Sequence, residues 1–160
     1  MMKYSMVALS LLTAVVLSAC AAPAPAPATL ATAALEGEAQ VRDLVENFGG
    51  RLQTVALLAP DAAQQIQTQY AGLASPALIE TWAADVSKAP GRVVSSPWPD
   101  RIEISSVDRE SAGRYVIDGF IVEITSTEVG SGGAAARIPV QIVVEGEEGR
   151  WLITAYAEGR

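Results

Sequence analysis

The spacing of apolar residues changes once along this chain, and that change constrains the fold more than any other feature. Between residues 35 and 88 apolar side chains recur at intervals of three and four, as in a helix with one buried face. After Asp100 the interval becomes two, which is the period of a strand. Helices followed by about four strands predict an α+β domain, with N-terminal helices packed on a curved antiparallel sheet.

The first helix is expected over residues 35–58, where Val41, Val45 and Phe48 lie on one helical face. Gly49 and Gly50 interrupt this pattern. Each glycine costs about 1 kcal/mol relative to alanine inside a helix. Either the helix bends at the pair or another backbone packs closely against it.

Two shorter helices are expected next. Asp61 is a candidate N-cap, with Gln64 three residues later completing a capping box. The third helix is expected to begin at Ser75 and Pro76, since serine caps helices and proline suits the first helical position. Trp82 falls on the buried face of that helix.

The alternating segments predict four strands. They cover Arg101–Val107, Arg114–Thr125, Arg137–Glu145 and Arg150–Tyr156. Gly119 lies inside the second strand, where it indicates a bulge or a sharp bend. Such a bend would curl the sheet around the first helix.

The N-terminus has the pattern of a targeting segment, which we assign to residues 1–19. Lys3 precedes an apolar stretch, which ends in Leu-Ser-Ala before Cys20, the only cysteine of the chain. This resembles a bacterial lipoprotein signal. The resemblance implies a lipid on Cys20 and anchoring to the cell membrane or outer membrane, outside the cytoplasm. The alternatives are an ordinary secretory signal or a retained anchor helix.

Residues 20–34 are rich in alanine and proline, and we expect an extended tether there. The domain is then expected over residues 35–160. The net charge of −7 disfavours nucleic acid as a partner. The chain has no histidine, and we expect neither a cofactor nor a metal ion. The glutamates at 145, 147 and 148 are better explained as a solvated hairpin tip than as a calcium site.

Several stretches resemble a family of secreted or lipid-anchored bacterial proteins. They are ENFGGRLQTVALLAP, SPALIETWAAD, APGRVVSSPWPDRIEI, FIVEITS and GRWLITAY. The resemblance spans residues 48–156 and implies a nuclear-transport-factor-2-like fold, also called cystatin-like or SnoaL-like. In this fold, helices pack against a curled sheet to form a cone. It implies a compartment and a fold rather than a particular activity. Members of this fold often dimerise through the sheet, so a homodimer is one expectation.

The most distinctive loop contains Pro97, Trp98 and Pro99, with charged residues on both sides. One interpretation is a binding site formed by Trp98 with Arg92, Asp100 and Arg101, to which Trp82 is added as a further candidate. The other, which we favour from the sequence, is a rigid corner whose indole plugs the open end of the cone.

Two carboxylates lie in an otherwise apolar strand, Asp118 and Glu123. A desolvated carboxylate acquires the raised pKa that a general base needs, and relatives of the fold use such groups in catalysis. The alternative, which we favour, is that they face solvent or pair with an arginine. Three functions follow: a non-catalytic lipoprotein that binds an envelope protein or a small apolar ligand, a small isomerase or hydrolyase, and a structural envelope module.

Overall fold

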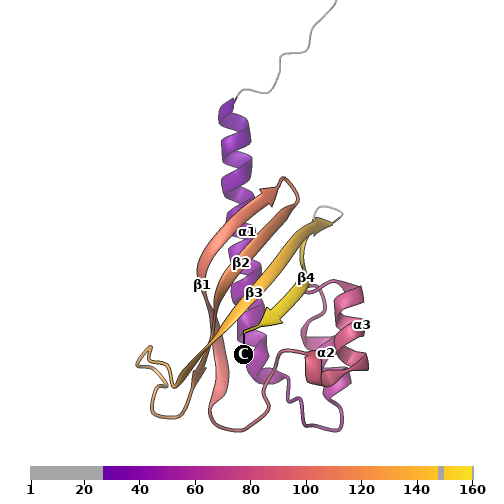
Figure 1. Cartoon of the computed structure of the whole chain (residues 1–160), viewed down its shortest axis with the longest axis vertical. Coiled ribbons are helices and arrows are strands. Elements are labelled where there is room, and N and C mark those ends of the chain that lie inside the picture. The colour runs from indigo at the N-terminus through magenta and orange to yellow at the C-terminus, as the bar shows by residue number, and fades with distance from the viewer. Residues whose placement is uncertain (1–26, 148–149, 160) are drawn as a thin grey trace, which may run out of the picture.

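The structure is a computed structural model that describes residues 27–147 and 150–159. Its helices precede its strands (Figure 1). The helical elements are α1 (Pro27–Arg51), η1 (Leu52–Thr54), α2 (Ala62–Gln69), α3 (Pro76–Ala84) and η2 (Val86–Lys88). The strands are β1 (Trp98–Ser111), β2 (Arg114–Ile124), β3 (Ala136–Glu147) and β4 (Arg150–Glu158).

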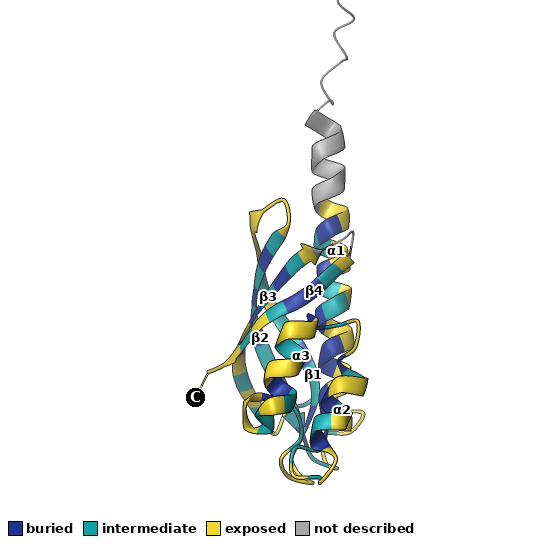
Figure 2. Cartoon of the chain, turned by 90° about the vertical axis from the view of Figure 1, so that its right-hand side faces the viewer, coloured by how far each residue is buried: buried dark blue, intermediate teal, exposed yellow. Residues whose placement is uncertain are grey.

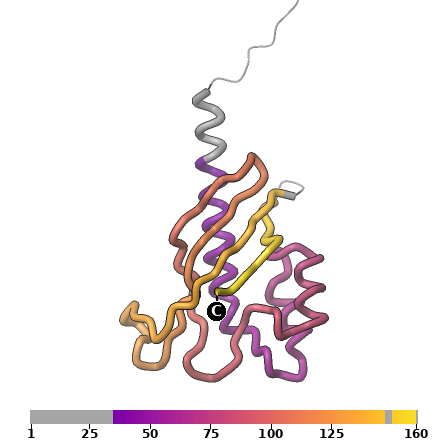
Figure 3. Tube along the Cα trace, in the orientation of Figure 1, coloured from indigo at the N-terminus to yellow at the C-terminus, as the bar shows by residue number. Residues whose placement is uncertain are grey.

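The four strands form one antiparallel sheet in the order β1-β2-β3-β4. One face of this curved sheet packs against α1, and α2 and α3 lie beside β4 (Figures 1 and 3). A side view shows α1 and the sheet as two layers with buried residues between them (Figure 2). The prediction of N-terminal helices on a curved antiparallel sheet is therefore confirmed.

The buried face of α1 is the one that the sequence pattern predicts. Val41, Val45 and Phe48 are fully buried, as is Leu52 just beyond the helix. Gly49 lies where the helix crosses β1. A Cβ atom placed on it would lie 2.7 Å from the backbone nitrogen of Ile102, so close backbone packing explains this glycine.

Two expectations for the helix starts are wrong. Residues 27–34 were expected to be extended, whereas α1 already begins at Pro27. Proline tolerates the first helical position and alanine is the strongest helix former, so the Ala-rich run extends the helix. At α2 the Asp61 side chain caps no backbone N–H, and it accepts a hydrogen bond from Gln65 Nε2 instead. Ser75 does cap α3, accepting from the Leu78 N–H.

Gly119 permits a close approach between two strands. A Cβ atom at this position would lie 2.5 Å from the Glu103 carbonyl oxygen of β1. The irregularity is on β1, where the register shifts between Ile104 and Ser106, opposite Gly119. The sequence located the distortion correctly, but the extra residue belongs to the partner strand.

A short segment before α3 covers part of the β4 edge. The Ile153 N–H donates to the Leu73 carbonyl, and the Ser75 N–H donates to the Ile153 carbonyl, at 2.9 and 2.8 Å. These bonds hold α3 beside the sheet and thereby fix the position of Trp82.

Aromatic side chains fill the space between the helices and this end of the sheet. Phe48, Tyr70 and Trp82 are at most 3% exposed, and their ring centroids lie 4.9 to 6.2 Å apart. The Tyr70 hydroxyl donates to the Pro90 carbonyl at 2.6 Å. The interior is therefore packed, and room for a ligand is found at its rim.

Candidate functional site at the rim of the core

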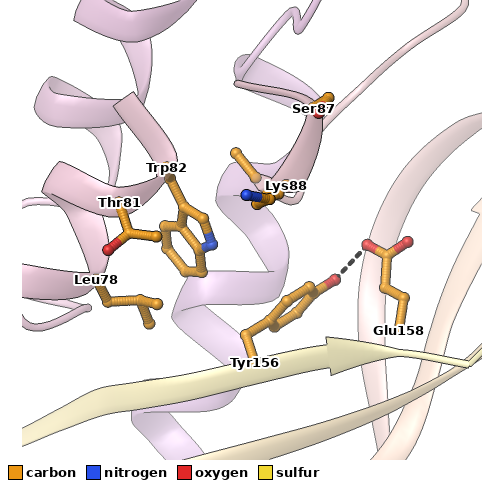
Figure 4. A pocket seen from close by; sticks show the side chains of 8 residues that line it. Leu78, Thr81, Trp82, Ser87, Lys88, Tyr156 and Glu158 are labelled. Atoms are coloured by element: carbon orange, nitrogen blue, oxygen red, sulfur yellow. Dashed lines mark hydrogen bonds between the residues drawn. The ribbon is translucent and has the colours of Figure 1, made fainter. Parts of the chain in front are cut away.

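A pocket of about 420 Å³ opens between α3, η2 and the end of β4 (Figure 4). We call it the mouth pocket. Its lining residues are Leu78, Thr81, Trp82, Ser87, Lys88, Ala89, Tyr156 and Glu158. Its size is within the range of about 300–1,000 Å³ that is typical of small-molecule sites.

Trp82 forms the aromatic wall of the mouth pocket. Its ring stacks on Phe48 and meets Tyr156 edge-on, with centroids 6.2 and 5.9 Å away. The side chain is 3% exposed, yet no described residue accepts a hydrogen bond from its indole N–H. Figure 4 shows this nitrogen facing the space between Trp82, Lys88 and Tyr156. Every fully buried polar side-chain atom of the described residues has a partner, so this N–H reaches the pocket and offers a donor to a ligand.

Tyr156 and Glu158 form the opposite wall. They are two residues apart on β4 and so lie on the same face of the strand. The Tyr156 hydroxyl donates to Glu158 Oε1 at 2.5 Å. Burial, and then the negative charge of Glu158, raise the pKa of Tyr156 well above its ordinary value. The phenol therefore stays protonated, and it orients a carboxylate that can accept further hydrogen bonds.

Lys88 brings a positive charge to the rim. Its Nζ lies 3.0 Å from Asp85 Oδ2, in a pair whose lysine side chain is 67% exposed. Hydrogen bonds from Ser87 and then Lys88 hold the pKa of Asp85 below its usual value. Exposed pairs of this kind contribute little to stability, so Lys88 can exchange this partner for a ligand at little cost.

Glu123 lies in a second, smaller cavity of about 130 Å³. Pro97, Pro99 and Glu158 also line this cavity. Burial, and then the charge of Glu158, raise the pKa of Glu123. Glu123 is thus a partly desolvated carboxylate, as a general base requires.

The raised pKa of Glu123 predicts a pH dependence of stability. The folded chain holds this proton more tightly than the unfolded chain, whose glutamate pKa is about 4.3. The contribution is therefore fully present below that pKa, and is lost as pH rises through the raised folded pKa. We expect Glu123→Gln to remove this decrease of stability with rising pH. Thermal unfolding measured at a series of pH values from acid to neutral would detect the change.

Glu103→Gln is the matched control for this prediction. A hydrogen bond from Arg101 is the largest cause of the lowered pKa of Glu103, so this group stabilises the fold above its unfolded pKa and loses its contribution as pH falls. The two variants should therefore change the pH profile with opposite signs. A Glu123→Gln profile parallel to that of the wild type would contradict the prediction.

Asp118 lies on the outer face of the sheet, away from α1. Its Oδ1 accepts from Gln141 Nε2 at 2.9 Å, and these two residues are direct cross-strand partners. This is the solvent-side arrangement that the sequence analysis favoured for Asp118. It lines neither the mouth pocket nor the smaller cavity, but it does line an open hollow of about 470 Å³ on the outer face of the sheet.

Trp98 does not plug the cone, and the prediction of an indole stopper is wrong. Its cross-strand partner is Ile124, which shares the outer face with Val122. Cross-strand partners project to the same side of a sheet, and Ile121 of the core projects to the other. Trp98 is half-buried on the outer face, because β1 begins at this residue and its two flanking prolines take the inward positions.

The charged residues of the same loop also lie away from the mouth pocket. Arg101 pairs with Asp100 at 2.8 Å and with Glu103 at 2.6 Å, and Glu103 also pairs with Arg137. Arg92 instead joins the loop to the chain after α1, where its backbone bonds to residues 55 and 57. Asp100 and Arg101 thus come together, but the structure does not bring either to Trp82.

Two charged residues of the mouth pocket, Lys88 and Glu158, did not emerge as candidates from the sequence. The spacing of Tyr156 and Glu158 was the available signal, because alternate residues of a strand share a face. What the sequence lacked was the placement of α3 and η2 opposite this strand.

Comparisons with known proteins add little to this description. No family model and no curated protein matches the chain. Among solved structures, a designed NTF2-like protein titled Rd1NTF2_05, with five substitutions, is 19% identical, with a TM-score of 0.31. The match covers 52% of this chain and 60% of the other, so the chain spans less than two thirds of that protein.

Proposed function

We propose that this protein is a lipid-anchored binding protein outside the cytoplasm, and that its nuclear-transport-factor-2-like domain holds a small ligand in the mouth pocket without catalysis. The observation that carries the proposal is the buried Trp82 whose indole N–H opens into a pocket of about 420 Å³. A buried donor facing a pocket of ligand size is the arrangement by which proteins orient small molecules.

Anchoring rests on the sequence pattern around Cys20. This residue and the signal segment lie outside the described residues, and so does the tether up to residue 26. Within 27–147 and 150–159, no helix combines the length and apolarity needed to cross a membrane. Two or three acyl chains on one cysteine would hold the domain stably, at about 0.8 kcal/mol per buried CH₂ group.

Binding is favoured over catalysis by the size of the cavity around Glu123. A general base must reach the proton that it removes, and about 130 Å³ is below the usual size of a ligand site. In the larger mouth pocket, Tyr156 is a poor base because burial raises its pKa. An isomerase or hydrolyase that used Glu123 would need the substrate to enter the smaller cavity.

Anchoring is tested by replacing the acylated thiol. We expect cells expressing the wild-type chain to incorporate radiolabelled palmitate into a membrane-bound product. Cys20→Ala should abolish the label, whereas Ala21→Ser, next to it, should retain it. A wild-type chain that carries no label, or that stays in the cytosol, would end this part of the proposal.

Ligand binding is tested on the acylated protein in detergent micelles with ¹⁵N-labelled tryptophan side chains. The probe is benzamide, a neutral molecule with an aromatic ring and a hydrogen-bond acceptor. It should shift the Trp82 indole N–H signal, assigned by Trp82→Phe, in a saturable way.

Two threonines provide a matched pair for this measurement. Thr81 lines the mouth pocket and Thr68 lies on α2, and both are exposed and donate to the carbonyl four residues earlier. Thr81→Trp should fill the pocket and abolish the shift, whereas Thr68→Trp should leave it intact. An unresponsive Trp82 signal in the wild type, or equal responses in both variants, would contradict the proposed function.

A further inference from the structure

The mouth pocket carries opposite charges on its two sides. The indole N–H of Trp82 and the ammonium of Lys88 come from α3 and η2, and both nitrogens face the same space (Figure 4). Across this space lies the Glu158 carboxylate, held by the Tyr156 hydroxyl. One side therefore presents donors, with a positive charge that Lys88 shares with Asp85, and the other presents an acceptor with a negative charge.

This arrangement selects for charge in a ligand. A carboxylate would accept hydrogen bonds from Trp82 and Lys88, and charge-assisted hydrogen bonds are about twice as strong as neutral ones. An ammonium would donate to Glu158. A ligand with one charge alone would form a charge-assisted hydrogen bond on one side of the pocket only, which lowers its affinity.

The wall between the two charged sides is aromatic. The rings of Trp82 and Tyr156 form it, and Leu78 lies beside Trp82, farther from Lys88 and Glu158 (Figure 4). The rings meet edge-on, at 89° and 5.9 Å between centroids, so they form a corner against which a compact hydrocarbon group can pack.

We propose that the ligand of the mouth pocket is a small zwitterion of the amino-acid type, with its carboxylate on Lys88 and Trp82, its ammonium on Glu158, and an apolar group between them. This inference rests on the proposed function, since it names the class of ligand that the same pocket takes. It predicts that both charges of the ligand are needed together.

The test uses the acylated protein in micelles and the Trp82 indole N–H signal. The probes are leucine and phenylalanine, each with its N-acetyl derivative, which is only an anion, and its amide, which is only a cation. At least one free amino acid should bind about tenfold or more tightly than both of its derivatives.

Two variants assign the charges separately. Lys88→Met should weaken binding of the free amino acid about tenfold and leave the affinity for its amide unchanged. Glu158→Gln retains an acceptor for the Tyr156 hydroxyl. It should weaken binding of the free amino acid and of its amide, but it should not weaken binding of the N-acetyl derivative. Glu80→Gln, on the exposed side of α3, is the control that should change none of these affinities.

The outcomes separate the two proposals. If benzamide binds but no free amino acid does, or if blocked derivatives bind as tightly as the free forms, the zwitterion inference is overturned and the pocket still binds ligands. If benzamide also fails, the proposed function fails first. If Lys88→Met and Glu158→Gln leave the preference for free amino acids unchanged, the assignment of the two charged groups is wrong.

Discussion

Trp82→Ala is expected to lower the free energy of unfolding by about 3–5 kcal/mol, the usual cost of truncating a large buried aromatic side chain. The indole is 3% exposed and contacts three other rings, those of Phe48, Tyr70 and Tyr156. Its removal would leave a cavity that α3 cannot close, because Leu73 and Ser75 hold the start of that helix to β4. Urea denaturation followed by circular dichroism measures the loss.

Trp98→Ala is the comparison that makes this result informative. Trp98 is half-buried on the outer face of the sheet and is not among the core residues of the described chain. We expect Trp98→Ala to lower the free energy of unfolding by less than half as much as Trp82→Ala does, and the domain to remain folded. An equal or larger loss at Trp98 would restore the idea of a structural corner and would argue against the arrangement described here.

Gly49→Ala is expected to lower the free energy of unfolding by about 1–3 kcal/mol, the range typical of overpacked cores. An added methyl group would lie 2.7 Å from the Ile102 backbone nitrogen and 3.1 Å from its side chain. A backbone atom cannot turn aside as a side chain can, so α1 and β1 must separate. Chemical denaturation of both proteins gives the difference.

Gly50→Ala is the matched control, because the two glycines are neighbours in the same helix. Gly50 is exposed, and a Cβ atom placed on it would meet nothing within 4 Å. Alanine should therefore stabilise the helix by about 0.5–1 kcal/mol, since it removes the entropic cost of glycine. Effects of the same sign at both positions would mean that contact with β1 does not explain Gly49.

The fold followed from the sequence because its signals are local. The spacing of Val41, Val45 and Phe48 defines one side of a helix, and alternation along β2 and β3 defines two sides of a sheet. Both patterns survive in the structure, since hydrophobic burial depends on which face a residue occupies. The start of α1 was missed because alternating prolines indicated an extended chain, while the alanines after Pro27 favour a helix.

The candidate site was harder to predict because it depends on register and on distant segments. Trp98 looked like a core residue, yet its pairing with Ile124 places it on the outer face, and no local pattern fixes that pairing. No pattern in the sequence singled out Glu158. It becomes part of a pocket only because η2 brings Lys88 close to the end of β4.

The bonds between Ile153 and the segment at Leu73 and Ser75 have a consequence for self-association. The outermost strand of a sheet can recruit a strand from another molecule, and this leads to aggregation. Here the edge at β4 is covered by that segment, and the edge at β1 is interrupted by register shifts. Both edges of the sheet are thereby discouraged from pairing with a strand of another copy, which protects the folded chain against aggregation through its edges.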